Sequence, residues 1–179
     1  MTKACIQYLK DHQEDFLEQL MEYLRIPSVS AQSDHADDIQ SCSDWLVAHC
    51  KTIGLKTRKI KTAGNPVVIA QTPRKGKSKK PHFMVYGHYD VQPPDPLNLW
   101  TTSPFEPHIE GDKLIARGAT DNKGQHFVHL KAVESYLKTG TELPCDITFM
   151  IEGEEEIGST HLESFLLETK ERLSADIIV

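Results

Sequence analysis

Residues 82–90 read HFMVYGHYD, a short apolar run that ends in a histidine and an aspartate. The run from His82 to Tyr86 is typical of a β-strand. If the chain stays extended beyond it, His88 and Asp90 point to the same side. An imidazole in this position can bind a metal while the carboxylate fixes its tautomer, although a His-x-Asp pattern alone is more often structural.

Apolar runs of this kind alternate with amphipathic helical segments along the chain. Helical spacing is present in residues 16–24, in the segment between residues 34 and 54, and in residues 127–137 and 160–173. Strand-like runs cover residues 55–60, 67–71, 82–86, 147–151 and 175–179, and residues 107–117 predict a hairpin with its turn at 110–113. The alternation predicts an α/β fold, with a mixed or parallel sheet layered between helices.

Residues that end helices support these boundaries. The first helix is expected to end before Pro27, because proline cannot continue the backbone hydrogen bonding. Ser33 or Asp34 can cap the second helix, and glycines at 54 and 140 can close the second and third helices.

Composition narrows the class of protein. The chain has 179 residues, enough for one domain with a hydrophobic core, and a net charge of -6. An acidic balance argues against nucleic acid or an anionic membrane as partner, and no run approaches the ~20 apolar residues of a membrane span. The one basic run, residues 74–80, is interpreted as a solvated hairpin or crossover loop. Four cysteines without metal or disulfide spacing predict free thiols, and the absence of a leader sequence favours the cytoplasm.

A second stretch with candidate ligands is residues 117–124, RGATDNKG, where the predicted hairpin ends and a helix begins. Asp121 can be the N-cap of that helix. An aspartate in a cleft can also offer one carboxylate oxygen to each of two metal ions. The residues alone leave both interpretations open.

The third stretch is residues 152–159, EGEEEIGS, which follow the buried strand predicted at 147–151. A charge run of this kind is usually a solvated turn. The strand, however, brings it to the sheet edge, where open α/β sheets bind their ligands. There one glutamate can bind a metal while its neighbour accepts a proton.

Together and in this order, the three stretches resemble a family of zinc-dependent exopeptidases. That family includes carnosinase-like dipeptidases, glutamate-releasing carboxypeptidases, acetylornithine deacetylase and succinyl-diaminopimelate desuccinylase. The resemblance covers nearly the whole chain, and the segment from Val91 through Trp100 to Phe105 is most similar to the dipeptidase branch. It implies that residues 1–179 are the N-terminal part of a catalytic domain. A dimerisation or lid domain and a C-terminal part would lie elsewhere, in a homodimeric full-length protein.

The resemblance implies a role for five side chains. His88 would be a terminal ligand of one metal, Asp90 the carboxylate that orients it, Asp121 the ligand that bridges both metals, Glu155 the general base, and Glu156 a ligand of the second metal. It also implies a cis peptide bond between Asp121 and Asn122.

The implied reaction is hydrolysis of the amide bond of dipeptides or short peptides by a metal-bridged water. The implied cofactors are two Zn²⁺ ions, which Mn²⁺ or Co²⁺ could replace in a carboxylate-rich site. Two alternatives stay open: a deacylase of N-acyl amino acids within the same family, and an inactive truncated metal-binding or scaffold module.

The family pattern also requires ligands that these residues do not supply. One is an aspartate after the strand that begins at Ala175, and the other is a distant histidine. The apolar run at 175–179 is interpreted as the start of another buried strand. A chain that stops on such a run makes us expect a piece of a longer protein. His126 and His129 are expected on a helix surface, because Phe127 and Leu130 define the buried face. Glu152 and Glu154 match no role in the family.

Overall fold

The computed structural model describes residues 2–73, 78–170 and 173–179. Its central sheet has five strands in the order β1-β2-β6-β3-β7. The strands are β1 (Lys56–Ile60), β2 (Val67–Gln71), β3 (His82–His88), β6 (Asp146–Glu152) and β7 (Ile177–Ile178). Strand β2 is antiparallel to both neighbours, whereas β6, β3 and β7 run parallel to one another. The predicted mixed α/β sheet is therefore confirmed.

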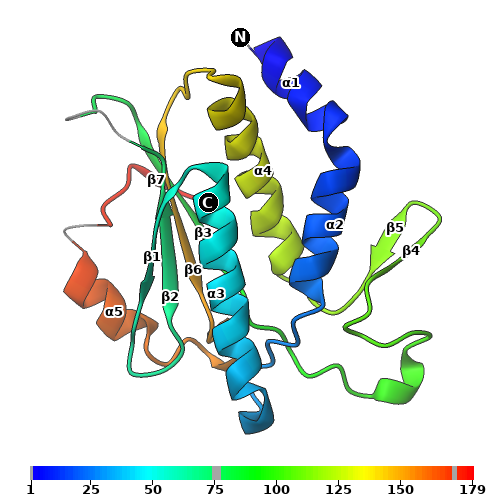
Figure 1. Ribbon diagram of the computed structural model, residues 1–179. Coiled ribbons are helices and arrows are strands. Elements are labelled where there is room, and N and C mark those ends of the chain that lie inside the picture. Colours follow the sequence, from blue (N-terminus) through cyan, green and yellow to red (C-terminus); the bar gives the residue numbers. More distant parts are fainter. Residues whose placement is uncertain (1, 74–77, 171–172) are drawn as a thin grey trace.

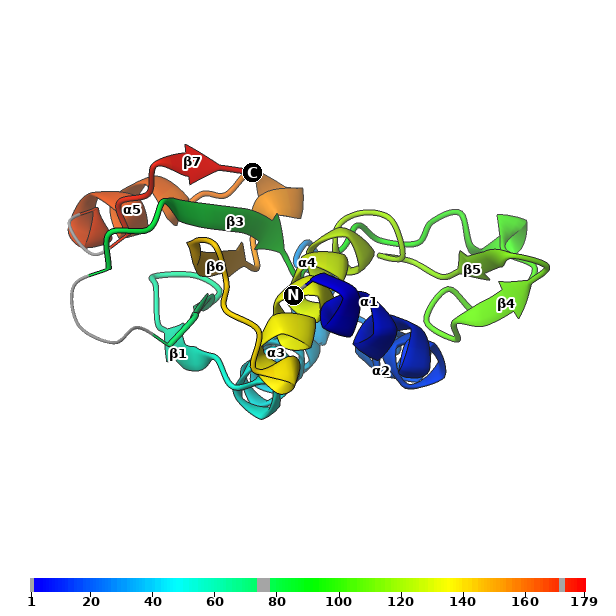
Figure 2. The ribbon, with the colours of Figure 1, turned by 90° about the horizontal axis from the view of Figure 1, so that it is seen from above.

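Helices cover both faces of this sheet (Figures 1 and 2). Helices α3 (Ala36–Ile53) and α4 (Lys123–Thr139) lie on one face, and α1 (Thr2–Asp11) and α2 (Gln13–Leu24) pack against α4. Helix α5 (Leu162–Thr169) lies on the opposite face. The predicted hairpin is present and consists of β4 (His108–Glu110) and β5 (Lys113–Ile115). It projects at the side of the molecule (Figure 1).

Alternation along the strands divides the apolar residues between two cores. Val68 and Ala70 of β2 join the larger core beneath α3 and α4. Val67 and Ile69 join the smaller core, which contains Phe165 of α5. Successive side chains of a strand point to opposite faces, so a central strand that is covered on both sides is apolar throughout.

The glycine ends of the long helices are confirmed, but the predicted N-cap is wrong. Gly54 and Gly140 follow α3 and α4 with φ angles of 104° and 65°, in the left-handed region that glycine adopts readily. A short 3₁₀ turn, Ser33–His35, precedes α3, and the capping position is His35, which makes no side-chain capping bond. The helix α1 was not indicated by the periodicity of the sequence.

The C-terminal elements are shorter than predicted. Helix α5 ends at Thr169, and part of the predicted helix, residues 171–172, lies outside the described residues. The strand expected to be buried is exposed, since Ile177 and Ile178 form an edge strand that pairs only with β3 among the described strands. Residues 74–77 of the basic run also lie outside the described part. Because β6 lies between β2 and β3 in the sheet, the connection from β2 to β3 is a crossover.

A further expectation from the sequence concerns the cysteines and is met. All four cysteines are free thiols, three of them buried. Within the described ranges, no helix combines the length and the apolar character that crossing a membrane would require.

His49 on α3 makes the stability of this fold sensitive to acid. Its ring stacks on Trp45 at 4.7 Å and on Phe127 at 5.4 Å, and Lys131 donates to its Nε2 at 2.9 Å. Burial, aided by the Lys131 charge, lowers the pKa of His49 from 6.5 to about 3. Between these values the unfolded chain binds the proton and the folded chain does not, so stability falls as pH drops from 6.5 towards 3.

We therefore expect His49→Gln to flatten the dependence of unfolding free energy on pH below 6.5 by about 1.4 kcal/mol per pH unit, the equivalent of one proton. Urea denaturation at several pH values, with a chelator present, measures this slope. His129→Gln, at an exposed position of α4, is the matched control. An unchanged slope in His49→Gln would show that His49 is not the source of this pH dependence.

Candidate metal centre

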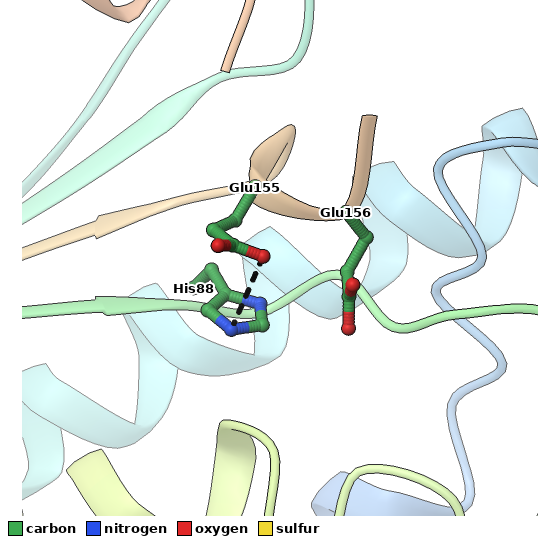
Figure 3. A group of neighbouring side chains, drawn as sticks. All are labelled: His88, Glu155 and Glu156. Atoms are coloured by element: carbon green, nitrogen blue, oxygen red, sulfur yellow. Dashed lines mark ion pairs between the residues drawn. The ribbon is translucent and has the colours of Figure 1, made fainter. Parts of the chain in front are cut away.

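The ends of two parallel strands bring the candidate ligands together. Strands β3 and β6 are in register with His88 opposite Glu152, so their carboxyl ends meet at one edge of the sheet. A 3₁₀ turn, Glu155–Ile157, begins shortly after the end of β6 at Glu152. The potential ligand atoms of His88, Glu155 and Glu156 all lie within 4.8 Å of one another. Figure 3 shows these three side chains.

The buried His88 imidazole is held from both nitrogens. Nδ1 lies 3.1 Å from the backbone oxygen of Asp90 and 3.4 Å from its carboxylate. Nε2 lies 3.1 Å from Asp121 Oδ1 and 3.8 Å from Glu155 Oε2. Burial lowers the pKa of His88, but Asp90 and Glu155 outweigh this effect and raise it to about 9. The surroundings of the His88 ring thus favour positive charge, whether a proton or a metal ion supplies it.

Asp121 reaches this cluster from the segment before α4. Its peptide bond to Asn122 is cis, as the resemblance implied. The interpretation of Asp121 as the N-cap of α4 is wrong, because Asn122 occupies that position and makes no capping bond. The Asp121 side chain is 75% exposed and lies beside His88, outside the three-residue group above.

Asp90 does more than orient His88. Its fully buried carboxylate accepts a hydrogen bond from Ser30 Oγ at 2.6 Å. It also accepts from the backbone N–H groups of Glu155 at 3.3 Å and Glu156 at 3.1 Å. One buried carboxylate therefore connects the end of β3 to the turn that carries both glutamates.

The acidic run is not the solvated turn that its composition suggests. Glu152 is buried and accepts from Tyr86 Oη at 2.6 Å and Ser159 Oγ at 2.8 Å, and burial raises its pKa. Glu154 is buried as well, accepts from the Asn65 backbone at 3.1 Å, and lies 2.9 Å from His161 Nδ1. These two glutamates fasten the strand end, which leaves Glu155 and Glu156 for the cluster.

Gln92 is a contact that the residue patterns did not single out. Its Nε2 donates to Glu156 Oε2 at 2.6 Å and to the Glu156 backbone oxygen at 3.2 Å. The signal was present, because Gln92 continues the alternating row of His88 and Asp90.

The expected surface position of His126 is wrong. Its side chain is 1% exposed, because α4 packs against α1, α2 and α3 as well as β3 and is buried over more than one stripe. Its ring nitrogens are hydrogen-bonded to Tyr23 Oη and Asn122 Oδ1, which satisfies both polar atoms away from water.

The donor set fits a divalent cation. It combines one imidazole with carboxylates, the nitrogen and oxygen ligands that zinc and related metals accept. Among the ion pairs of the described residues, none joins Asp121, Glu155 or Glu156 to a lysine or arginine. A bound cation would offset the mutual repulsion of these carboxylates.

Comparisons with known proteins agree with this site. The profile of the peptidase family M20/M25/M40 matches residues 84–179, the part that contains His88, Asp121 and Glu156. The chain belongs to this family, and the resemblance stated above is confirmed.

The similar proteins include dipeptidases. The chain is 32% identical to the Cys-Gly metallodipeptidase DUG1 of Candida albicans over 84% of its own length and 34% of that protein. The structure of human carnosine dipeptidase 1 has a TM-score of 0.90 and 30% identity, covering 98% of this chain and 40% of that one. The M20 family metallo-carboxypeptidase Sso-CP2 from Sulfolobus solfataricus has a TM-score of 0.83 and 38% identity, with 92% and 36% covered. The chain thus spans little more than a third of the length of these relatives.

Proposed function

We propose that the complete protein is a di-metal hydrolase that cleaves the amide bond of dipeptides or short peptides. The observation that carries this proposal is the convergence of His88, Asp121, Glu155 and Glu156 at one sheet edge in a member of this peptidase family. The relatives named above are dipeptidases and a carboxypeptidase, which supports a short peptide as substrate.

Three side chains would hold the metals in this proposal. His88 would bind one metal, Glu156 would bind the other, and Asp121 would bind both. We propose Zn²⁺ for both positions, with Mn²⁺ or Co²⁺ as possible replacements. When bound, such a pair supplies activation of a water molecule and polarisation of the scissile carbonyl.

Glu155 is proposed as the general base. Its side chain is 44% exposed and, among the described residues, its one ion pair is the contact with His88 at 3.8 Å. The backbone N–H of Glu155 donates to Asp90, so the backbone of this residue is held in place while its carboxylate is not. It can accept a proton from the attacking water and deliver that proton to the leaving amine.

We also propose that residues 1–179 form the N-terminal part of the catalytic domain. Their coverage of the relatives supports this, since they match little more than a third of each. The remaining aspartate and histidine ligands and a lid or dimerisation domain would then belong to the rest of a homodimeric protein. The unpaired thiols agree with a reducing compartment, and we place the protein in the cytoplasm.

A substrate panel tests the proposal. The full-length protein is incubated with dipeptides, tripeptides and N-acyl amino acids, with added Zn²⁺ or Mn²⁺ and with a chelator as control. Metal-dependent cleavage of dipeptides is expected. Faster cleavage of N-acyl amino acids would favour the deacylase alternative, and no cleavage of any substrate with either metal would favour an inactive metal-binding or scaffold module.

A further inference from the structure

A buried polar chain lies behind the candidate ligands, and none of the roles proposed above uses it. His126 Nδ1 is 2.9 Å from Asn122 Oδ1, and His126 Nε2 is 3.1 Å from the Tyr23 hydroxyl of α2. Asn122 Oδ1 in turn lies 3.1 Å from the backbone nitrogen of His88. This buried polar chain thus connects helix α2 to the backbone of a candidate metal ligand.

The direction of each hydrogen bond in this chain is determined. The backbone N–H of His88 can only donate, so the Asn122 atom that it meets must be the oxygen. That oxygen can only accept, and His126 Nδ1 must therefore carry the proton. In a neutral imidazole only one nitrogen carries a proton, so Nε2 then accepts from the Tyr23 hydroxyl. Burial, together with nearby positive charges, lowers the pKa of His126 to about 3, in agreement with a neutral ring.

The Asn122 amide takes the place of a neighbouring strand. On the edge of β3 that faces β7, Tyr86 N donates to Val179 O at 2.8 Å. The next backbone N–H on that edge belongs to His88, two residues further along, and it donates to Asn122. The residue that follows Asp121 therefore holds the backbone of His88 directly.

Gly87 shows how closely these groups approach. A Cβ atom at this position would lie 2.6 Å from Asn122 Oδ1 and 3.1 Å from His126 Nδ1. Any side chain there would push the amide and the imidazole away from β3. The strand end therefore accommodates the polar chain only because residue 87 is glycine.

We propose that His126 is a positioning residue for the metal centre. As a donor to Asn122, it fixes the segment that carries Asp121 against the backbone of His88, and so sets the separation of these two ligands. The inference rests on the proposed function, since it assumes that His88 and Asp121 bind metal. It concerns the side chain behind them, whose loss would loosen ligands that it never touches.

Variants of the full-length protein test the role. His126→Leu removes the donor and is expected to weaken Zn²⁺ binding, measured by competition with a chromophoric chelator, by about 10–100-fold. His126→Asn places an amide nitrogen where Nδ1 lies and should bind close to wild type. His126→Gln moves the donor one bond further from the backbone and is not expected to bind Zn²⁺ like the wild type. His129→Leu, on the exposed face of the same helix, is the control. Should His126→Leu fail to fold, the Asn and Gln variants decide.

A second measurement does not depend on metal. Long-range ¹⁵N–¹H spectra of the imidazoles at about pH 7 are expected to show His126 neutral with its proton on Nδ1. A proton on Nε2, or a folded His126→Leu or His126→Gln protein with wild-type Zn²⁺ affinity, would overturn the positioning role while peptide hydrolysis by the wild type still stands. A wild type that neither binds Zn²⁺ nor cleaves peptides would overturn the proposed function and, with it, this inference.

Discussion

Glu155→Gln in the full-length protein is expected to lower kcat for dipeptide hydrolysis by about 10²–10⁴-fold, the contribution typical of a positioned general base. Glutamine keeps the size of the side chain and the anchored backbone N–H, but it cannot accept the proton. Since His88, Asp121 and Glu156 are proposed as the ligands, the Zn²⁺ content should stay at the wild-type level. Steady-state kinetics together with metal analysis of the purified variant measure both quantities.

A matched control for this prediction is Glu163→Gln, on the exposed side of α5. It makes the same change of charge away from the sheet edge and should leave kcat unchanged. Two results would remove Glu155 from the role of base. One is turnover that survives in Glu155→Gln, and the other is loss of turnover that is explained entirely by loss of Zn²⁺.

Much of the fold could be predicted because its elements follow simple local rules. Strand β2 has the predicted bounds, Val67–Gln71, and Gly54 and Gly140 end the two long helices. The failures occur where tertiary contacts decide. The run at Ile177–Ile178 is apolar enough for a buried strand, but its exposure depends on which strands lie beside it. The periodicity of the sequence predicts one buried stripe on α4. Its neighbouring helices bury additional faces of α4, and His126 lies on one of these additional buried faces.

The candidate site was predictable as a set of ligand types but not as a set of contacts. Parallel β3 and β6 brought His88 and Glu156 together because strand ends meet at one edge. Nothing in the spacing of the sequence shows that a run of four glutamates divides into two buried anchors and two groups that face the cluster. That division depends on Tyr86 and Asn65, which belong to distant segments.

The connection through Asp90 gives the second large prediction. Its carboxylate accepts from Ser30 and from the backbone N–H groups of Glu155 and Glu156, and it lies beside His88 Nδ1. Asp90→Asn keeps the shape but replaces one accepting oxygen with an NH₂ donor. At least one buried N–H or O–H group then faces another donor, which costs roughly 1–3 kcal/mol of stability.

Asp90→Asn should weaken metal binding as well as the fold. The change loosens His88 and the Glu156 turn at once, so Zn²⁺ affinity is expected to fall by about 100-fold, the upper end for partners of metal ligands. Competition titration and urea denaturation of the full-length protein measure the two quantities. Ser30→Ala removes only one hydrogen bond to this carboxylate and should cost about 1 kcal/mol with a smaller loss of affinity. Asp112→Asn, in an exposed turn, is the neutral control.

One outcome would contradict this role of Asp90. If Asp90→Asn weakened the fold but bound Zn²⁺ like the wild type, Asp90 would act only as an anchor between β3 and the acidic turn. The orientation of His88 would then have to come from the Asp90 backbone oxygen, which lies 3.1 Å from Nδ1.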